Sequence, residues 1–390
     1  MMKALSTLIF LLAIHYCSLA QNHPYSPKFS HEIEKDLAEG NIYESRAALL
    51  SSLIGDYRAS TSYSDIDVSW GVDSINFGGL SIQDALPFIV ESASHHRIVI
   101  ISENHSKPQH RIFALDLITE LARIGYGHLG METLSSYPDN SLADTMLHDR
   151  GYPLNHPITG TYTLEPQMGN VVREALKLDY RLFPYERTTR GGEKDREEIQ
   201  ADNISSYLSE NPDAKIVILC GFHHAIESDL KKNSESQWMA SYLKTKTGLD
   251  PLTIYQDNFT EKFINNEHPL LRRINVSAPS VFTDASGSLV SLTPHVDVEV
   301  VHPRTVYNNG RPNWMYRNGQ RRAVEINKKE IVDYPVLVSA FPIGETNSVP
   351  MDRVELKYQN DNKVLVLSPG IYRIEIYDGA NVTTIEQEVK

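Results

Sequence analysis

The middle of the chain alternates between short, continuously apolar runs and longer stretches in which apolar residues recur at helical spacing. Ile98–Ile101 is a run of the first kind, and so is Lys215–Cys220 after its leading lysine. Such runs are typical of strands covered on both faces, as in a parallel sheet. Strands that alternate with helices predict an α/β fold with a central, mostly parallel sheet flanked by helices, over residues 81–325. Further strands are expected at 128–131, 180–185 and 252–255, and helices at 170–178, 194–210 and 236–246.

The first of these strands leads into a helix with a start signal. Ser106 is followed three residues later by Gln109, and Pro108 stands in the first turn. This arrangement predicts a capping box, in which each of the two side chains bonds to a free backbone amide beside the other residue. Gly125 ends the helix, and a second strand follows at once. Residues 98–132 are therefore expected to form one strand–helix–strand unit.

Three regions outside this alternation have patterns of their own. Residues 21–80 are helical in composition and predict a helical N-terminal extension. Residues 330–390 contain short β-rich runs joined by turn sequences, which predicts a small antiparallel, β-sandwich-like module. Association with a surface or a glycan is one role that such a module could have. Residues 135–166 are dense in Pro, Gly, His and Tyr, which favours an insertion or lid, with a disordered excursion as the alternative.

The first 20 residues have the pattern of a secretory signal peptide. Lys3 precedes the apolar run Leu8–Ile14, and Ser18-Leu19-Ala20 stands ahead of Gln21. We therefore expect cleavage near Ala20 and a protein that is secreted, periplasmic or on the cell surface. Cleavage would remove Cys17 and leave Cys220 as the one cysteine, so no intramolecular disulfide is expected.

Charge and hydropathy exclude two classes of partner. The formal net charge is −13 at pH 7, and no cluster of Lys and Arg is evident. Nucleic-acid binders are usually basic on at least one face, so a nucleic-acid partner is not expected. After the predicted signal, no apolar stretch is long enough to span a bilayer, and no transmembrane segment is expected.

Ionisable residues recur where the predicted strands end. Glu103 and His105 follow the first strand, Glu132 follows the second, and the pair His223 and His224 follows Lys215–Cys220. The carboxyl ends of parallel strands meet at one edge of the sheet, where such folds bind their ligands. These groups are therefore expected to form one site. Single histidines after a strand are more often surface or capping residues, and Glu103 with His105 could merely cap the following helix.

Two kinds of chemistry suit such a set of residues. A histidine oriented by a carboxylate can take a proton from water, while a second cation stabilises the developing negative charge. Alternatively, Glu103, His105 and His224 could bind a divalent metal with an open water position. Spacing alone does not separate the two readings. Neither a GxSxG nor an HExxH motif is present, so neither the usual active site of a serine hydrolase nor that of a zinc protease is expected.

The segments SENHSKPQHR, GYGHLGMET and LCGFHHA resemble the superfamily that unites erythromycin esterases, ChaN-type haem-binding proteins and the Tiki metalloproteases. That superfamily has a Gly-Glu-x-His segment after the first strand, and Ser102 replaces its glycine here. Arg111, Glu132 and His224 fall at matching positions of the later motifs, and His223 is a neighbour of uncertain role. The resemblance spans about residues 85–255 and implies an α/β fold.

The expected function is an exported hydrolase that acts on an ester or amide bond of a small-molecule or peptide substrate. His105 is expected to be the general base, with Glu103 and Glu132 orienting it or binding metal. His224 and Arg111 are expected to stabilise the negative charge. The ChaN branch implies an alternative, a protein that binds haem or another small ligand without catalysis. Candidate haem ligands in the insertion are His148, Tyr152, His156 and Tyr162.

Overall fold

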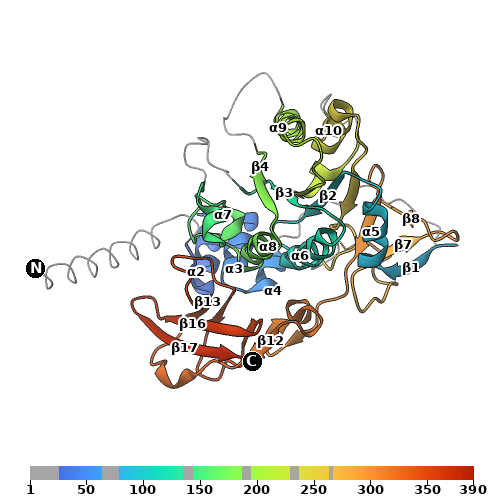
Figure 1. The fold of residues 1–390 in the computed structure, drawn as a ribbon. Helices are drawn as coiled ribbons and strands as arrows, with labels where there is room; N and C mark the ends of the chain where they lie inside the picture. The colour runs from blue at the N-terminus through green and yellow to red at the C-terminus, as the bar shows by residue number, and fades with distance from the viewer. Residues whose placement is uncertain (1–25, 64–78, 135–143, 187–194, 229–236, 263–266) are drawn as a thin grey trace, which may run out of the picture.

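The computed structural model describes residues 26–63, 79–134, 144–186, 195–228, 237–262 and 267–390. The predicted signal peptide and part of the predicted insertion lie outside these residues. Within them, the chain forms a central sheet flanked by helices and a second region of smaller antiparallel sheets (Figure 1). None of the helices in the described part of the chain is long and apolar enough to cross a bilayer.

The central sheet has nine strands among the described residues, and most of its pairings are parallel. The strand order is β1-β7-β9-β6-β2-β5-β3-β4, and β8 pairs with β7. All neighbours from β9 to β4 are parallel, whereas β1, β7 and β8 pair antiparallel at one side. The bounds are β1 Ser81–Asp84, β2 Ile98–Glu103, β3 His128–Met131, β4 Arg181–Pro184, β5 Ile216–Gly221, β6 Leu252–Tyr255, β7 Ser280–Thr283, β8 Leu289–Val290 and β9 Val298–Val301.

Helices cover both faces of this sheet, as its continuously apolar strands require. Val99 and Ile101 of β2 face a core shared with α5, α6 and α8, whereas Ile98 and Ile100 face a core shared with α9 and α10. Figure 1 shows these two sets of helices on opposite sides of the strands. The predicted mostly parallel α/β fold is therefore confirmed. The helix bounds are α5 Ala85–Ala93, α6 Pro108–Ala122, α8 Pro166–Lys177, α9 Arg196–Glu210 and α10 Met239–Thr247.

The predicted capping box at the start of α6 is wrong. The helix begins at Pro108, and its N-cap is Lys107, whose side chain makes no capping bond. The Gln109 side chain, one of the two predicted partners, donates instead to Pro303 O, and the backbone carbonyl of Ser106 accepts a bond from Ser60 Oγ. Tertiary contacts of the turn have therefore replaced the local cap.

The N-terminal helices pack against the C-terminal region. They are α2 Ser30–Ala38, α3 Glu44–Leu53 and α4 Tyr57–Tyr63. Ile33 and Leu50 share a buried cluster with Leu337 and Val349. The Arg353 guanidinium also donates to the carbonyl of Leu53 at 2.9 Å. Segments about 300 residues apart in the sequence thus stabilise one another.

The C-terminal region contains separate antiparallel sheets, as its turn-rich β pattern predicts. The largest has the order β14-β13-β16-β17, and two short pairs, β10-β11 and β12-β15, lie outside it. Strand bounds are β10 Tyr307–Asn308, β11 Arg311–Pro312, β12 Arg322–Val324, β13 Val336–Pro342, β14 Asp352–Leu356, β15 Leu365–Leu367, β16 Gly370–Tyr377 and β17 Val382–Val389. Short helices elsewhere are α7 Leu147–Arg150, η2 Tyr162–Leu164, η3 Phe222–Ala225, η4 Asn313–Gly319 and η5 Lys328–Glu330.

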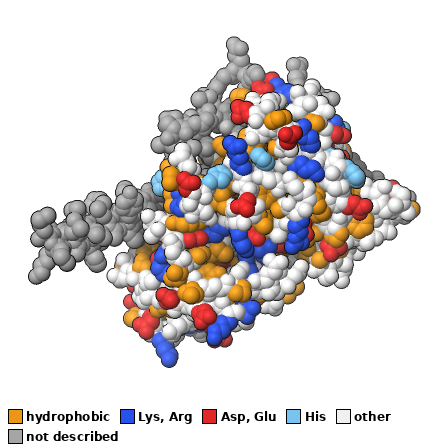
Figure 2. Space-filling model, viewed as in Figure 1, with side chains coloured by type: hydrophobic (Ala, Val, Ile, Leu, Met, Phe, Trp, Pro, Cys, Tyr) orange, Lys and Arg blue, Asp and Glu red, His pale blue; other side chains and the backbone are white. Residues whose placement is uncertain are grey.

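On the face shown in Figure 2, acidic, basic and histidine side chains are interspersed.

Candidate functional site

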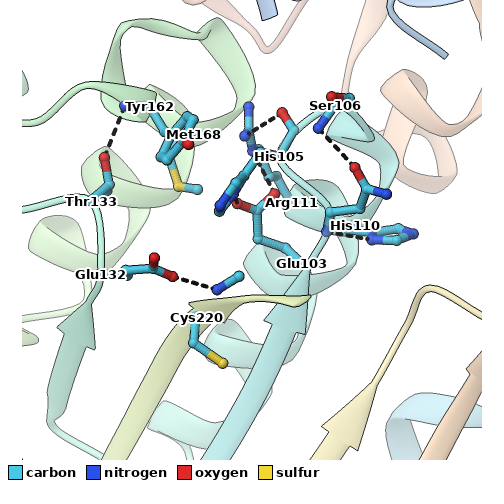
Figure 3. Close-up of polar contacts among 12 residues, drawn as sticks. Glu103, His105, Ser106, His110, Arg111, Glu132, Thr133, Tyr162, Met168 and Cys220 are labelled. Carbon is cyan, nitrogen blue, oxygen red and sulfur yellow. Dashed lines mark hydrogen bonds and ion pairs between the residues drawn. The ribbon is translucent and has the colours of Figure 1, made fainter. Parts of the chain in front are cut away.

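Three neighbouring strands bring the predicted site residues together. Strand β5 lies between β2 and β3 in the sheet, so the carboxyl ends of all three are adjacent. Glu103 is the last residue of β2 and pairs with Gly221 of β5, while Glu132 directly follows β3. His224 lies in η3, immediately after β5. Figure 3 shows the Glu103 and Glu132 side chains above these strand ends.

Glu103 and His105 form a close pair. His105 Nδ1 lies 2.5 Å from Glu103 Oε1, and the other carboxylate oxygen accepts a bond from Arg111 Nε at 3.2 Å. The imidazole stacks on Tyr162, with ring centroids 4.0 Å apart, and meets the edge of Phe222. With Nδ1 bound to the carboxylate, the neutral ring carries its free lone pair on Nε2, on the opposite side. The pair therefore has the geometry of a carboxylate-oriented general base.

Glu103 is ionised. Burial raises the pKa of this carboxyl, but the charges and hydrogen bonds of Arg111 and His105 outweigh burial and hold the pKa below its usual range. An ionised Glu103 keeps the proton of His105 on Nδ1 and stabilises the imidazolium that forms when Nε2 takes up a second proton.

Arg111 links this pair to a second buried carboxylate. Its Nη1 donates to Glu165 at 2.9 Å and its Nη2 donates to the His105 carbonyl at 2.9 Å. Glu165 caps the start of α8 by accepting the Met168 amide, and the Tyr57 hydroxyl donates to its other oxygen. The Arg111 side chain is fully buried. Through these bonds Arg111 fixes the positions of the Glu103 carboxylate and the His105 backbone.

Glu132 is the centre of a second network. The Gly221 amide donates to one oxygen of Glu132 at 2.6 Å, and Arg196 Nη2 donates to the other at 2.6 Å. His224 Nε2 lies 3.6 Å from that second oxygen, and its Nδ1 lies 2.6 Å from Glu197. His105 and His224 are thus both near Glu132, because the charge of each ring lowers the pKa of this carboxyl.

In this second network, burial and the neighbouring charges shift the pKa values in opposite directions. Burial raises the pKa of Glu132, but His224, His105, Arg196 and the Gly221 amide together lower it to about 2. Burial lowers the pKa of His224, but Glu132 and Glu197 outweigh it and raise the pKa above the ordinary 6.5. Glu132 is therefore a carboxylate at neutral pH. Its charge and that of Glu197 shift His224 toward the protonated form, whereas Arg196, whose Nη1 lies 3.2 Å from His224 Nε2, opposes this shift.

The backbone after β5 has an unusual turn. Phe222 has a φ of 41°, a left-handed conformation that is costly for an aromatic residue. The turn places the edge of the Phe222 ring against His105 and directs His224 toward Glu132. His223 has a different environment, because its ring packs against Trp238 and Tyr255. Cys220 is buried and contacts the Ile101 carbonyl.

A small cavity of ≈ 10 Å³ lies between the two halves of the site. This volume is about what one water molecule needs. A Cβ atom on Gly221 would lie 2.6 Å from His105 Nε2 and 3.1 Å from Glu132 Oε2, so both groups border the same spot above this glycine. The cavity is lined by Glu103, His105, Met131, Glu132, Thr133, Tyr162, Met168, Leu219 and Cys220.

Replacing Gly221 with alanine is therefore expected to displace His105. The added Cβ would lie 2.5 Å from His105 Cε1, closer than packed atoms tolerate, and overpacking of this kind costs about 1–3 kcal/mol. Urea unfolding measures the loss. Gly127→Ala is the matched control, because its Cβ would meet nothing within 4 Å. Equal stability of the two variants would contradict the close approach of His105 to Gly221.

The proposed metal ligands do not meet at one point. Among the described residues, no group of three or more His, Cys, Asp or Glu side chains is placed to hold a metal ion. Glu103 and His105 bind each other, while His224 contacts Glu132 and Glu197. Arg111 and Arg196 occupy carboxylate oxygens that a metal would need. The donor set of the described site does not fit a divalent cation.

The described site does not fit haem either. Its cavity of ≈ 10 Å³ is far below the roughly 300 Å³ of the smallest usual ligand pockets. The candidate haem ligands have other contacts: His148 Nε2 accepts the Leu182 amide, His156 Nδ1 accepts the Ile158 amide, the Tyr152 hydroxyl contacts Thr346, and Tyr162 stacks on His105.

Three charged residues of the site are not among those predicted from the sequence. Glu165, Arg196 and Glu197 stand at the starts of α8 and α9. In a sheet with right-handed crossovers, a helix that returns to the next parallel strand begins at the carboxyl edge of the sheet. Charged residues in the first turn of each such helix are therefore candidates for the site, and this signal is present in the sequence.

Comparison with protein-family models and with curated proteins gives no match for this sequence. Among solved structures, weak neighbours include the type III effector HopBA1, with 13% identity over 59% of this chain and 98% of that chain, at a TM-score of 0.35. A second is ChaN of Campylobacter jejuni, described with cofacial haem binding, with 9% identity over 58% and 98% of the two chains and a TM-score of 0.31. A third is RRSP, a toxin effector domain from Vibrio vulnificus, with 12% identity over 54% and 45% and a TM-score of 0.30.

Proposed function

We propose that this protein is an exported hydrolase that cleaves an ester or amide bond of a small-molecule or peptide substrate. The observation that supports this most is the 2.5 Å contact between Glu103 and His105 Nδ1, made by a histidine that also lines the small cavity. A carboxylate-bound histidine thus borders a space of about one water molecule. The export part of the proposal depends on the predicted signal peptide, which lies outside the described residues.

In the proposed reaction, His105 Nε2 takes a proton from a water molecule while the water oxygen attacks the carbonyl carbon. The π electrons of the carbonyl move onto its oxygen and form a tetrahedral oxyanion. When the intermediate collapses, the bond to the alkoxide or amine breaks, and His105 returns its proton to that leaving group. Water is consumed, and an acid and an alcohol or amine are formed.

The other residues have distinct parts in this scheme. Glu132, ionised at neutral pH, accepts a hydrogen bond from the second O–H of the attacking water and so aligns the water. His224 and Arg196 supply positive charge beside Glu132, on the side where negative charge develops. Arg111 is fully buried behind Glu103, so we propose that it orients the base rather than contacts the oxyanion. His223 packs against aromatic rings and has no part in the scheme.

The test is hydrolysis by the purified mature protein of a panel of chromogenic esters and amides, with and without a chelator. Turnover of at least one substrate that the chelator leaves unchanged is the expected result. Turnover that stops on chelation and returns with added metal would replace this mechanism with a metal-dependent one. No turnover of any ester or amide would overturn the proposed function.

The rate is expected to fall on the alkaline side of its pH profile as His224 loses its proton. The groups that face this ring are Glu132, Glu197, Arg196 and Trp238, and the two carboxylates raise its pKa above 6.5. The same shift stabilises the folded protein fully below about pH 6.5, and this contribution is lost as the pH rises through the raised pKa.

His224→Gln is expected to lower the rate about 10²–10³-fold and to remove the alkaline limb. The measurement is the pH profile of kcat/KM. The matched control is His96→Gln, because His96 binds the Ser92 carbonyl at the amino end of β2, away from the site. An alkaline limb that persists unchanged in His224→Gln would show that another group causes it.

A further inference from the structure

A pair of fully buried histidines lies behind the turn that carries Glu103 and His105. His110 is in the first turn of α6, and His302 directly follows β9. Neither side chain is accessible to solvent. Their rings stack with centroids 4.9 Å apart and planes 18° from parallel, and the edge of Phe113 meets His302. This pair takes no part in the reaction proposed above.

Hydrogen bonds define the tautomer of each ring. The Asn104 amide donates to His110 Nδ1 at 3.1 Å, so the proton of His110 is on Nε2. Gln256 Nε2 donates to the Ser102 carbonyl at 2.5 Å, so its Oε1 accepts from His302 Nε2 at 3.0 Å. Burial, with the nearby charge of Lys107, lowers the pKa of both rings, that of His302 to about 3. Both rings are therefore neutral.

The same turn is held on a further side by the side chain of Asn104. Its Nδ2 donates to Asp257 Oδ1 at 2.8 Å, and its Oδ1 accepts the Ser106 amide at 3.0 Å. Asp257 and His302 both lie just after strands, β6 and β9. The backbone on either side of Glu103 is thus bonded to His110 of α6 and to Gln256 after β6, and Gln256 is bonded in turn to His302 after β9. Figure 3 shows His110 on the side of this turn away from Glu132.

We propose that His110 is a positioning residue for the Glu103–His105 pair, because its Nδ1 accepts the backbone amide of the residue between them. The inference depends on the proposed function, since it concerns the placement of the base. Without this acceptor, a buried amide has no partner, and the turn must move to find one. A shift of about 1 Å at a catalytic group costs about 10²-fold in rate, so a small displacement of the turn is enough to be measured.

The experiment compares two variants of His110. His110→Leu keeps apolar volume but removes the acceptor, and is expected to lower kcat about 10–100-fold with KM unchanged. His110→Asn offers a carbonyl oxygen near the position of Nδ1 and is expected to recover most of the lost kcat. Hydrogen exchange of the Asn104 amide, measured by NMR, should be faster in His110→Leu and protected in His110→Asn.

Tyr126→Phe is the control for a purely structural effect. The buried Tyr126 hydroxyl donates to the Ala93 and His96 carbonyls near the amino end of the sheet, so this variant loses a comparable buried bond away from the site. It is expected to be less stable than wild type but to keep its kcat. An Asn104 amide as protected in His110→Leu as in wild type, or an equal loss of kcat in Tyr126→Phe, would overturn the inference. If the wild type hydrolyses nothing, the proposed function fails, and amide exchange alone decides the role of His110.

Discussion

Replacing His105 with glutamine is expected to lower turnover by about 10²–10⁴-fold. Glutamine retains a side chain that can bond to Glu103, but it cannot take a proton from water at neutral pH. The loss is expected in kcat rather than in KM, because removal of a general base destabilises the transition state without changing the affinity for the substrate. The measurement is kcat and KM on a substrate from the ester and amide panel.

The control for this variant is His128→Gln. His128 is partly buried at the first residue of β3 and contacts the Tyr207 hydroxyl at 2.7 Å, which places it at the opposite edge of the sheet from Glu132. Its replacement is expected to leave kcat unchanged. A His105→Gln protein that retains more than about a tenth of the wild-type kcat would be incompatible with general-base catalysis by His105.

Replacing Arg111 with methionine is expected to destabilise the fold by about 3–5 kcal/mol, the usual cost of removing one partner from a buried ion pair. Arg111 joins Glu103 and Glu165, and all three side chains are nearly or fully buried. Methionine fills a similar length but leaves two buried carboxylates without their shared cation. Urea unfolding at pH 7 measures the loss. Arg123→Met is the control: its side chain is exposed and paired with Glu120, so the change should cost less than about 1 kcal/mol.

The cost of Arg111→Met is expected to depend on pH. The lowered pKa of Glu103 in the wild type stabilises the fold above its ordinary value of 4.5, and this contribution is lost as the pH falls through the lowered pKa. Without Arg111, Glu103 can protonate at a higher pH and escape its unpaired charge. The difference between wild type and variant should therefore shrink between about pH 7 and pH 4. A difference that stays constant over this range would contradict the ionic role of Arg111.

The site residues that follow strands were predicted from the sequence, whereas those at the starts of α8 and α9 were not. Glu103, His105, Glu132 and His224 were all expected at one sheet edge, and the structure places them in two neighbouring networks there. The adjacency of β2, β5 and β3 is what brings the networks together. Arg196 was not expected, because the prediction considered residues at strand ends and not the first turns of α8 and α9, and its partner Glu132 is 64 residues away.

The role of Arg111 also depended on distant residues. The sequence places it one turn into a helix that starts beside Glu103, which is compatible with contact to an oxyanion or to a carboxylate. Its second partner, Glu165, is 54 residues away. Packing of α8 against α6 brings that carboxylate to the guanidinium and buries all of it, which selects the orienting role in our proposal.

By itself, the sequence determined the α/β class, the positions of the buried strands and the edge at which Glu103, His105 and Glu132 would lie. These follow from local apolar periodicity and from the handedness of crossovers, neither of which needs the strand order. Only the tertiary structure decided that Glu197 and Glu132 hold His224, that Gln109 bonds to Pro303 instead of forming the predicted cap, and which cations hold each carboxylate. Those outcomes depend on side-chain directions and on contacts between distant segments, where burial makes each unpaired charge costly enough to select its partner.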